Sequence, residues 1–243
     1  MSKRRYTLRM TSDRNEQIEA DALHHALAVF HAYREGDLQL DDQHTHIRFV
    51  AEPSSGRLIA SAPAATFFAS QLVLFVPEET DEALSLLLSV EEIEESHATD
   101  RWLAFHLGQT AASDSADQQP DTGRETPEHT RWAAFWIDSA KHGPWVFDGD
   151  AFMTPNPAAS QEPAICKRLN GRRDDLATLC IKRTGADMAG EPVCVGVDPR
   201  GLYVRLAHGV VRIDFPPPPP GAPAEVETLE TLVDRLLNEA NLA

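Results

Sequence analysis

The stretch THIRFVAEPSSGRLIASA at residues 45–62 decides the fold class. Apolar and polar side chains alternate from Ile47 to Ala51, which is the period of a strand with one buried face. Pro53-Ser54-Ser55-Gly56 then supplies turn residues, and the apolar triplet Leu58-Ile59-Ala60 follows. The pattern predicts a β-hairpin over residues 45–62.

Further segments on both sides of this hairpin have a recognisable period. The run QLVLFVP at 71–77 ends in a proline and predicts a buried strand, and RWLAFHL at 101–107 is also interpreted as a strand. RWAAFWI at 131–137 is apolar on both faces, which favours a central strand. Residues 16–35 have apolar side chains at helical spacing and predict a helix with Gly36 as its stop.

Two polar segments separate these elements. Residues 78–100 contain nine acidic residues and no Lys or Arg, and the apolar side chains from Ala83 to Val90 predict a helix with a solvated acidic face. Residues 109–130 are rich in Ser, Asp, Gln, Thr, Pro and Gly without an apolar period. That composition predicts a mobile surface loop.

The C-terminal third alternates helices and strands. Helices are predicted at 163–169 and 174–183, the second with Gly185 as its stop. Strands are predicted at 193–197, 202–206 and 210–215, and the short turns between them require an antiparallel meander. Pro216 to Pro220 predict a polyproline spacer, and an apolar stripe from Val226 to Leu237 predicts a final helix.

The composition bounds the function. A formal charge of −16 disfavours nucleic acid and anionic membranes as partners, because Lys and Arg dominate such contacts. No apolar run reaches the roughly 18–20 residues that span a bilayer, and the first residues have no secretory apolar region. Cys166, Cys180 and Cys194 form no Cys-x-x-Cys pair, so we expect free thiols, no structural metal and a cytoplasmic protein.

Four short stretches in the C-terminal third carry a family resemblance. They are Leu169-Asn170, Leu176-Ala177-Thr178-Leu179, VGVDPRGL at 195–202 and RIDFP at 212–216. With the element order around them, they resemble the C-terminal domain of HugZ-type haem-utilisation proteins.

The resemblance implies a fold and a set of ligands. In that family this domain follows a split β-barrel of the flavin-binding, pyridoxamine-phosphate-oxidase-like class. The expected fold is therefore α+β: a split β-barrel (FMN-binding-like) in residues 1–155, then a small α+β domain in 156–243 with a three-stranded antiparallel meander and flanking helices. FMN or haem is the implied cofactor, and a homodimer the implied assembly.

Two departures from the family concern haem. Where the family carries a histidine a few residues after the asparagine, this sequence has Arg173. The histidine-bearing tail associated with haem binding has no counterpart before Ala243. Both departures disfavour haem degradation.

Three residues are candidates for holding a flavin phosphate. Ser139 and Lys141 follow the predicted central strand and resemble the Ser-x-Lys segment of pyridoxamine-phosphate oxidases. Arg101, at the start of a predicted strand, is the third candidate, and Arg131 occupies an equivalent position. The alternatives are an ordinary polar loop for the Ser-x-Lys segment and surface charges packed on tryptophan for the arginines.

The sequence gives weaker evidence for a metal site or an acid–base site than for a phosphate site. His44 and His46 share one face of a strand near Asp41 and Asp42, and His24 and His31 lie seven residues apart, but the spacing fixes no third ligand. The acidic run from Glu91 to Glu95 lacks the turn residues of a calcium loop. We interpret these residues as solvated or core-edge side chains.

Three functions stay open from the sequence. The first is a HugZ-like protein that binds a flavin- or haem-related ligand with degenerate or absent catalysis. The second is an FMN-dependent oxidoreductase. The third is a non-enzymatic interaction or regulatory module that uses the predicted acidic helix and proline spacer. No Gly-x-Ser-x-Gly, phosphate-loop or Gly-x-Gly-x-x-Gly motif occurs, which disfavours hydrolase, NTPase and Rossmann functions.

Overall fold

The computed structural model describes residues 3–106, 130–185, 191–207, 209–216 and 228–241, and their side chains except those of 3–15 and 239–241. The predicted mobile loop at 109–130 lies outside these residues except for Thr130. The described residues form two compact units, one drawn from 1–49, 61–93 and 130–154, the other from 50–60, 94–129 and 155–243. The predicted domain boundary after residue 155 stays a prediction.

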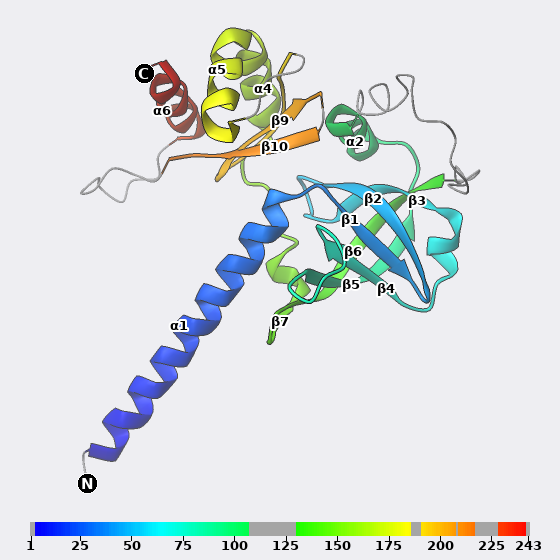
Figure 1. The fold of residues 1–243 in the computed structure, drawn as a ribbon, viewed down its shortest axis with the longest axis vertical. Helices are drawn as coiled ribbons and strands as arrows, with labels where there is room; N and C mark the ends of the chain where they lie inside the picture. The colour runs from blue at the N-terminus through cyan, green and yellow to red at the C-terminus, as the bar shows by residue number, and fades with distance from the viewer. Residues whose placement is uncertain (1–2, 107–129, 186–190, 208, 217–227, 242–243) are drawn as a thin grey trace. The chain divides into compact units, whose positions relative to one another are not determined.

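The larger sheet closes into a barrel (Figure 1). Its strands are β1 (Glu35–Leu40), β2 (Gln43–Ala51), β3 (Leu58–Pro63), β4 (Leu72–Val76), β5 (Leu84–Glu92), β6 (Thr130–His142) and β7 (Trp145–Asp148). They follow the order β3-β2-β1-β4-β5-β6-β7, and a pairing of β3 with β6 closes six of them into an antiparallel barrel. Two short 3-10 helices, η1 (Ala64–Phe68) and η2 (Gly149–Ala151), complete this part of the chain. The predicted hairpin, both buried strands and the barrel are confirmed.

Alternation along the strands separates the barrel interior from its outer face. On β4, Leu72, Leu74 and Val76 are buried; on β5, Leu84, Leu86 and Leu88 are buried. Because successive side chains point to opposite faces, Phe75 and Ser85, which pair with each other in register, point outwards. On these two strands the buried face is therefore aliphatic, and the serines of β5 lie on the outer face.

The helix predicted from Ala83 to Val90 within the acidic segment 78–100 is wrong, because residues 84–92 form β5, and helix α2 (His97–His106) begins only near the end of the segment. β5 pairs with β4 on one side and with β6 on the other. The run LSLLLSV suits a helix and a strand equally by composition. The barrel decides for the strand, because alternate leucines fill its interior.

The predicted N-terminal helix is confirmed as α1 (Lys3–Ala32). Gly36, expected as its stop, instead lies inside β1, a strand that the sequence did not reveal because EGDLQL is short and polar. A Cβ atom at Gly36 would lie 2.3 Å from the carbonyl oxygen of Phe75. The glycine therefore permits the close approach of β1 to β4.

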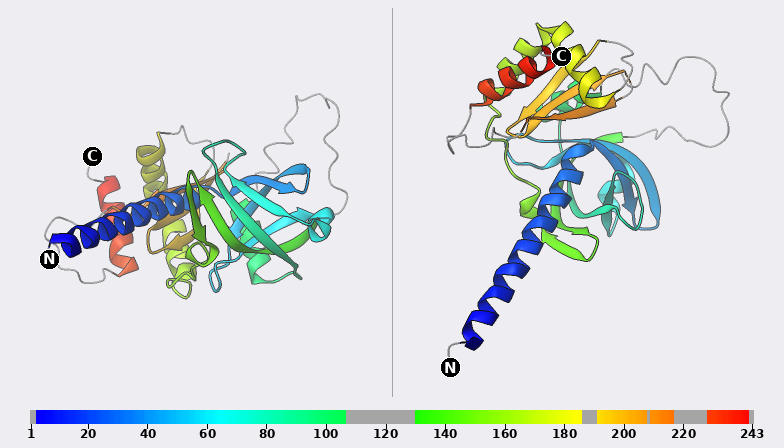
Figure 2. Two further views of the ribbon diagram at one scale, coloured as in Figure 1. Left: turned by 90° about the horizontal axis from the view of Figure 1, so that it is seen from below. Right: turned by 60° about the vertical axis from the view of Figure 1, so that its left-hand side comes forward.

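The second unit is an antiparallel meander with helices on both faces (Figures 1 and 2). Its strands are β8 (Val193–Asp198), β9 (Gly201–Leu206) and β10 (Gly209–Asp214), in the order β10-β9-β8. The helices besides α2 are α4 (Glu162–Asn170), α5 (Arg173–Thr184) and α6 (Leu229–Asn241). The predicted meander and its flanking helices are confirmed, and Gly185 ends α5 in the left-handed conformation at φ 65°. Most of the predicted proline spacer, from Pro217 onwards, lies outside the described residues.

Residues of β9 alternate between the two faces of the meander. Leu202 and Val204 belong to the core shared with α4, α5 and α6. The ring of Tyr203 lies 5.7 Å from that of Phe105 on α2, and Arg205 donates a hydrogen bond to the carbonyl of Ala104. Helix α2 therefore covers the face opposite α4, α5 and α6.

The predicted strand over residues 101–107 is wrong, because residues 97–106 form α2. Ser96 precedes this helix, and its hydroxyl accepts a hydrogen bond from the Ala98 N–H at 3.3 Å. A serine at that position is a helix-start signal, and the apolar run RWLAFHL masked it.

A buried ion-pair network joins the three strands of the meander. The guanidinium of Arg212 donates to both carboxylate oxygens of Asp198, at 2.8 and 3.0 Å, and lies 4.9 Å over the ring of Tyr203. The Tyr203 hydroxyl donates to Asp198 at 2.9 Å. Asp198 also accepts the N–H groups of Arg200 and Gly201, which fixes the β8–β9 turn.

This network predicts acid sensitivity. Burial alone would raise the pKa of Asp198, but the hydrogen bonds and charge of Arg212, with the Arg200 N–H and the Tyr203 hydroxyl, lower that pKa to about 2. A lowered folded-state pKa stabilises the fold above the ordinary value of 3.8, and that contribution, about 2 kcal/mol, disappears as pH falls towards 2. Thermal unfolding between about pH 5 and pH 2 should show the loss in wild type and a flatter profile in Asp198→Asn. Parallel profiles would contradict it.

Candidate functional site

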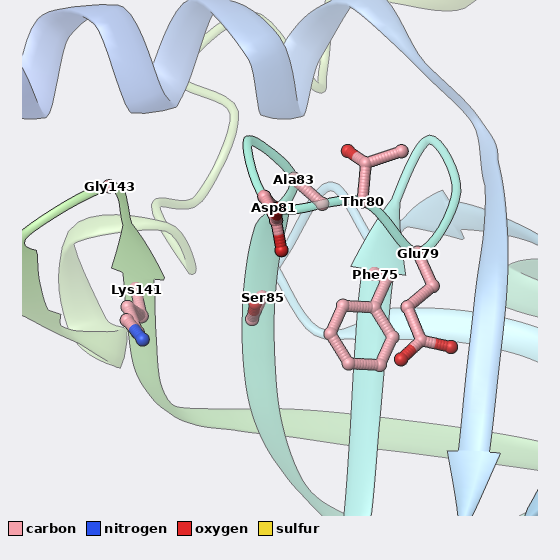
Figure 3. A pocket seen from close by; sticks show the side chains of 8 residues that line it. All are labelled: Phe75, Glu79, Thr80, Asp81, Ala83, Ser85, Lys141 and Gly143. Carbon is pink, nitrogen blue, oxygen red and sulfur yellow. The ribbon is translucent and has the colours of Figure 1, made fainter.

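A cleft opens on the outer face of the barrel at one end of β4, β5 and β6 (Figure 3). Its volume is about 420 Å³, which lies in the range of small-molecule sites. The walls come from Phe75 on β4, Ser85 on β5 and Lys141 on β6, three neighbouring strands. The β4–β5 connection contributes Glu79, Thr80, Asp81 and Ala83, and Gly143 completes the lining.

Of the residues predicted to hold a flavin phosphate, Lys141 lines this cleft, and it lies with Ser139 inside β6 and not in a loop after it. Ser139 lies two positions before Lys141, so both side chains point to the same side of the strand. The register places Lys141 opposite Ser85 and Ser139 opposite Leu87. No ion pair joins the Lys141 ammonium to any other described residue. An ammonium and hydroxyl groups next to an aromatic ring can hold a phosphate and stack a planar group.

The remaining charges of the cleft are negative. Glu79 and Asp81 outnumber the single cation Lys141, and Glu79 pairs with His44 at 3.3 Å. Both carboxylates are exposed at the rim, where solvent screens their repulsion of an anion. The cleft is thus a mixed-charge site and not a purely cationic phosphate pocket.

Arg101, the third candidate, belongs to the second unit. It lies on α2, and its guanidinium donates to the Glu162 carboxylate at 2.6 Å and lies 4.8 Å over the Phe105 ring. The Arg101 and Glu162 side chains are only 17% and 8% exposed. The other oxygen of Glu162 accepts the Val197 N–H at 2.8 Å. These contacts tie α2, α4 and β8 together, so Arg101 is already engaged in packing. By contrast, Arg131 pairs with Glu92 on the exposed surface.

The histidines considered as metal ligands pair with carboxylates of the barrel surface. Nδ1 of the His46 ring lies 3.1 Å from the Asp37 carboxylate, and the Glu35 carboxylate lies 3.6 Å from the other ring nitrogen. The hydrogen bond to Glu35, with the contributions of Asp37, outweighs burial and raises the pKa of His46. Within the described part of the chain, no three His, Cys, Asp or Glu side chains are arranged to hold a metal ion.

A second pair of histidines lies near the cleft. The ring of His142, next to Lys141 on β6, stacks on that of His25 from α1 with centroids 5.1 Å apart. Burial, with electrostatic repulsion between the two rings, lowers the pKa of His142. Both effects favour the neutral form of the stacked His142 ring.

Several of the residues that carry the family resemblance make contacts that stabilise the second unit. Asp198 and Arg212 form the ion pair of the meander, and the Asn170 side chain bonds both backbone groups of Cys194. Arg173, at the position where the resemblance led us to expect a histidine, pairs with Glu191 on the exposed surface. The resemblance therefore reflects how the second unit holds together.

Sequence reasoning missed most of the cleft. Phe75 and Ser85 are ordinary strand residues, and Glu79 and Asp81 belong to the acidic segment that precedes the wrongly predicted helix. Outward-facing residues of adjacent strands meet only once the register is known. The alternation of Ser85 and Ser89 with leucines in residues 84–92 would have placed Ser85 on the outer face, whereas residues 72–76 are apolar throughout and give no such signal for Phe75.

The chain is similar in fold to a solved protein of unknown function. This is Atu2129 from Agrobacterium tumefaciens str. C58, with 18% identity, a TM-score of 0.63, and coverage of 89% of this chain and 95% of the other. A heme binding protein from Mycobacterium smegmatis aligns at 15% identity over 91% of this chain and 98% of its own, but its TM-score of 0.37 supports no argument. No protein-family model matches the sequence, and no curated protein does either.

Among the described residues, no helix combines the length and apolar character needed to cross a bilayer.

Proposed function

We propose that this protein binds a planar, phosphate-bearing ligand of the FMN class in the cleft on the outer face of β4, β5 and β6, without turnover. The observation that carries the proposal is the Lys141 ammonium, unpaired among described residues, which lines one cleft together with the Phe75 ring and the Ser85 hydroxyl. The ring offers a stacking surface, and the cation offers a charge-assisted bond to phosphate. The split β-barrel and the Ser139–Lys141 segment support the same ligand class.

The absence of turnover is inferred from what lines the cleft. Its titratable groups are Lys141 and the exposed carboxylates Glu79 and Asp81. None of these combines burial with a close charged partner, the usual means of preparing a catalytic acid or base. An FMN-dependent oxidoreductase stays the alternative within the same site, and NADH oxidation by the FMN-loaded protein would establish it.

Substituting Lys141 by Ala should weaken FMN binding about tenfold or more, because a hydrogen bond to a charged group is worth about 1.5–3 kcal/mol. Quenching of flavin fluorescence during titration measures the dissociation constant. Asp81→Asn should act in the opposite direction and strengthen binding a few-fold, because it removes a rim charge that repels the phosphate. Added salt should reduce both differences.

Lys167→Ala is the matched control, because it removes an exposed lysine from α4 outside the cleft. It should leave FMN affinity unchanged. If Lys141→Ala and Lys167→Ala bind FMN equally well, the site assignment fails. If wild type binds haemin and not FMN, with a new Soret band, the flavin class fails while a ligand-binding role survives.

The interaction-module alternative loses one of its two supports. The acidic helix it requires is a strand, β5, and most of its proline spacer lies outside the described residues.

We further infer a relation to the HugZ-type proteins, a homodimer and a cytoplasmic location. The quoted sequence stretches support the first. Leu87, Trp136 and Val146, exposed on three neighbouring strands, provide apolar surface for a second copy. Three free cysteines suit a reducing compartment. Sedimentation of the purified protein tests the dimer.

A further inference from the structure

Two of the three cysteines, one on a helix and one on a strand of the second unit, face each other. The Cys166 sulfur, on α4, lies 3.6 Å from the Cys194 sulfur, on β8. The two positions are 28 residues apart in sequence. Their contact is therefore a product of the fold, and a bond between the sulfurs would require a movement smaller than 2 Å.

One face of α4 holds the pair in place. Glu162, Cys166 and Asn170 recur every four residues, so they lie above one another on the helix. Glu162 accepts the Val197 N–H at 2.8 Å, and Asn170 accepts the N–H of Cys194 at 2.8 Å and donates to its carbonyl at 3.0 Å. Hydrogen bonds thus hold the helix against β8 on both sides of Cys166. They keep the two sulfurs opposite each other.

The two thiols differ in access. Cys194 is 2% exposed, and its thiol donates to the Gly196 carbonyl at 3.6 Å. Cys166 is half-buried and so reachable from solvent. The hydrogen bond to Cys166 and burial raise the pKa of Cys194. A small reagent therefore meets Cys166 first, while Cys194 is placed to react only with Cys166.

We propose that Cys166 and Cys194 form a thiol–disulfide exchange site for low-molecular-weight disulfides such as oxidised glutathione. The Cys166 sulfur attacks one sulfur of the glutathione disulfide, which forms a mixed disulfide and releases one glutathione thiol. The Cys194 sulfur then attacks the Cys166 sulfur, which forms the Cys166–Cys194 bond and releases the second glutathione thiol. Two protein thiols lose two electrons and two protons, and one disulfide is reduced to two thiols.

Incubating the full chain with oxidised glutathione, then counting thiols after denaturation, tests the proposal. Wild type should fall from three reactive thiols to one, with peptide mapping placing the new bond between residues 166 and 194. Cys194→Ala should stop at a glutathione adduct on Cys166, and Cys166→Ser should react at neither remaining cysteine. The oxidised wild type should melt several degrees higher, reversibly with dithiothreitol, because a crosslink constrains the unfolded chain.

Cys180 provides the internal control. It lies on α5 and is fully buried, and the sulfur–sulfur contact found among the described residues joins Cys166 to Cys194, so Cys180 should stay reduced throughout. Cys180→Ala should oxidise like wild type. Retention of three thiols by wild type, a bond involving Cys180, or a stable Cys166 adduct in wild type that never resolves would each overturn the proposal.

Discussion

Replacing Arg212 by Ala should lower the free energy of unfolding by about 3–5 kcal/mol, because the change leaves a buried carboxylate without its cation. Arg212 and Asp198 are 8% and 16% exposed. The variant also removes the cation over the Tyr203 ring and the bond to Asp214. Chemical denaturation followed by circular dichroism measures the loss, provided both units unfold in one transition.

Two further variants make the Arg212 result interpretable. Arg200→Ala removes an exposed arginine from the same turn but keeps the backbone N–H that Asp198 accepts, so it should change stability by no more than about 0.5 kcal/mol. The double variant Asp198→Ala, Arg212→Ala should cost less than the sum of the single changes, since no unpaired charge stays buried. Strict additivity would show that the two residues act independently.

Replacing Arg101 by Ala should destabilise the protein by about 3 kcal/mol, because Glu162 would keep the Val197 N–H but lose its buried cation. The loss of the guanidinium from the Phe105 ring adds to this effect. Thermal unfolding in the absence of any ligand measures it. We expect the substitution to affect stability and not ligand binding, because the Arg101 guanidinium is already engaged by Glu162 and Phe105 in the second unit.

Arg131→Ala is the matched control for Arg101. Both arginines precede a tryptophan, but Arg131 and its partner Glu92 are about half exposed, at 48% and 51%. An exposed pair of this kind contributes at most about 1 kcal/mol. If Arg101 acted instead as a phosphate clamp, Arg101→Ala would retain the wild-type melting temperature and lose FMN affinity.

The local sequence pattern was sufficient to predict an element where a segment has a single hydrophobic period and turn residues at its end. The hairpin around Pro53–Gly56, the strand at 72–76 and the meander were all predicted within a few residues of their observed bounds. Each carries turn residues with specific backbone preferences at its ends. The final helix was predicted from its apolar stripe, which packs through Val233 and Leu236 into the core.

The same reasoning failed where an apolar run fits two periods. Leu84–Val90 satisfies a helix as well as a strand, and its pairing with β4 and β6 decided the outcome. Residues 101–107 were assigned from apolar density alone, and the capping serine before them was overlooked. Burial of one face of α2, through Phe105, needs the opposing meander.

The sequence by itself determined the hairpin, the buried strands and the meander, because period and turn chemistry are local properties of the chain, and the family resemblance supplied the expectation of a closed split barrel. Only the tertiary structure decided which distant residues meet: Phe75 with Ser85 and Lys141 at the cleft, Arg101 with Glu162, and Cys166 with Cys194. Such meetings depend on strand register and helix rotation. Register and rotation are set by the packing of the whole core, and a shift of one residue would turn each of these side chains to another face.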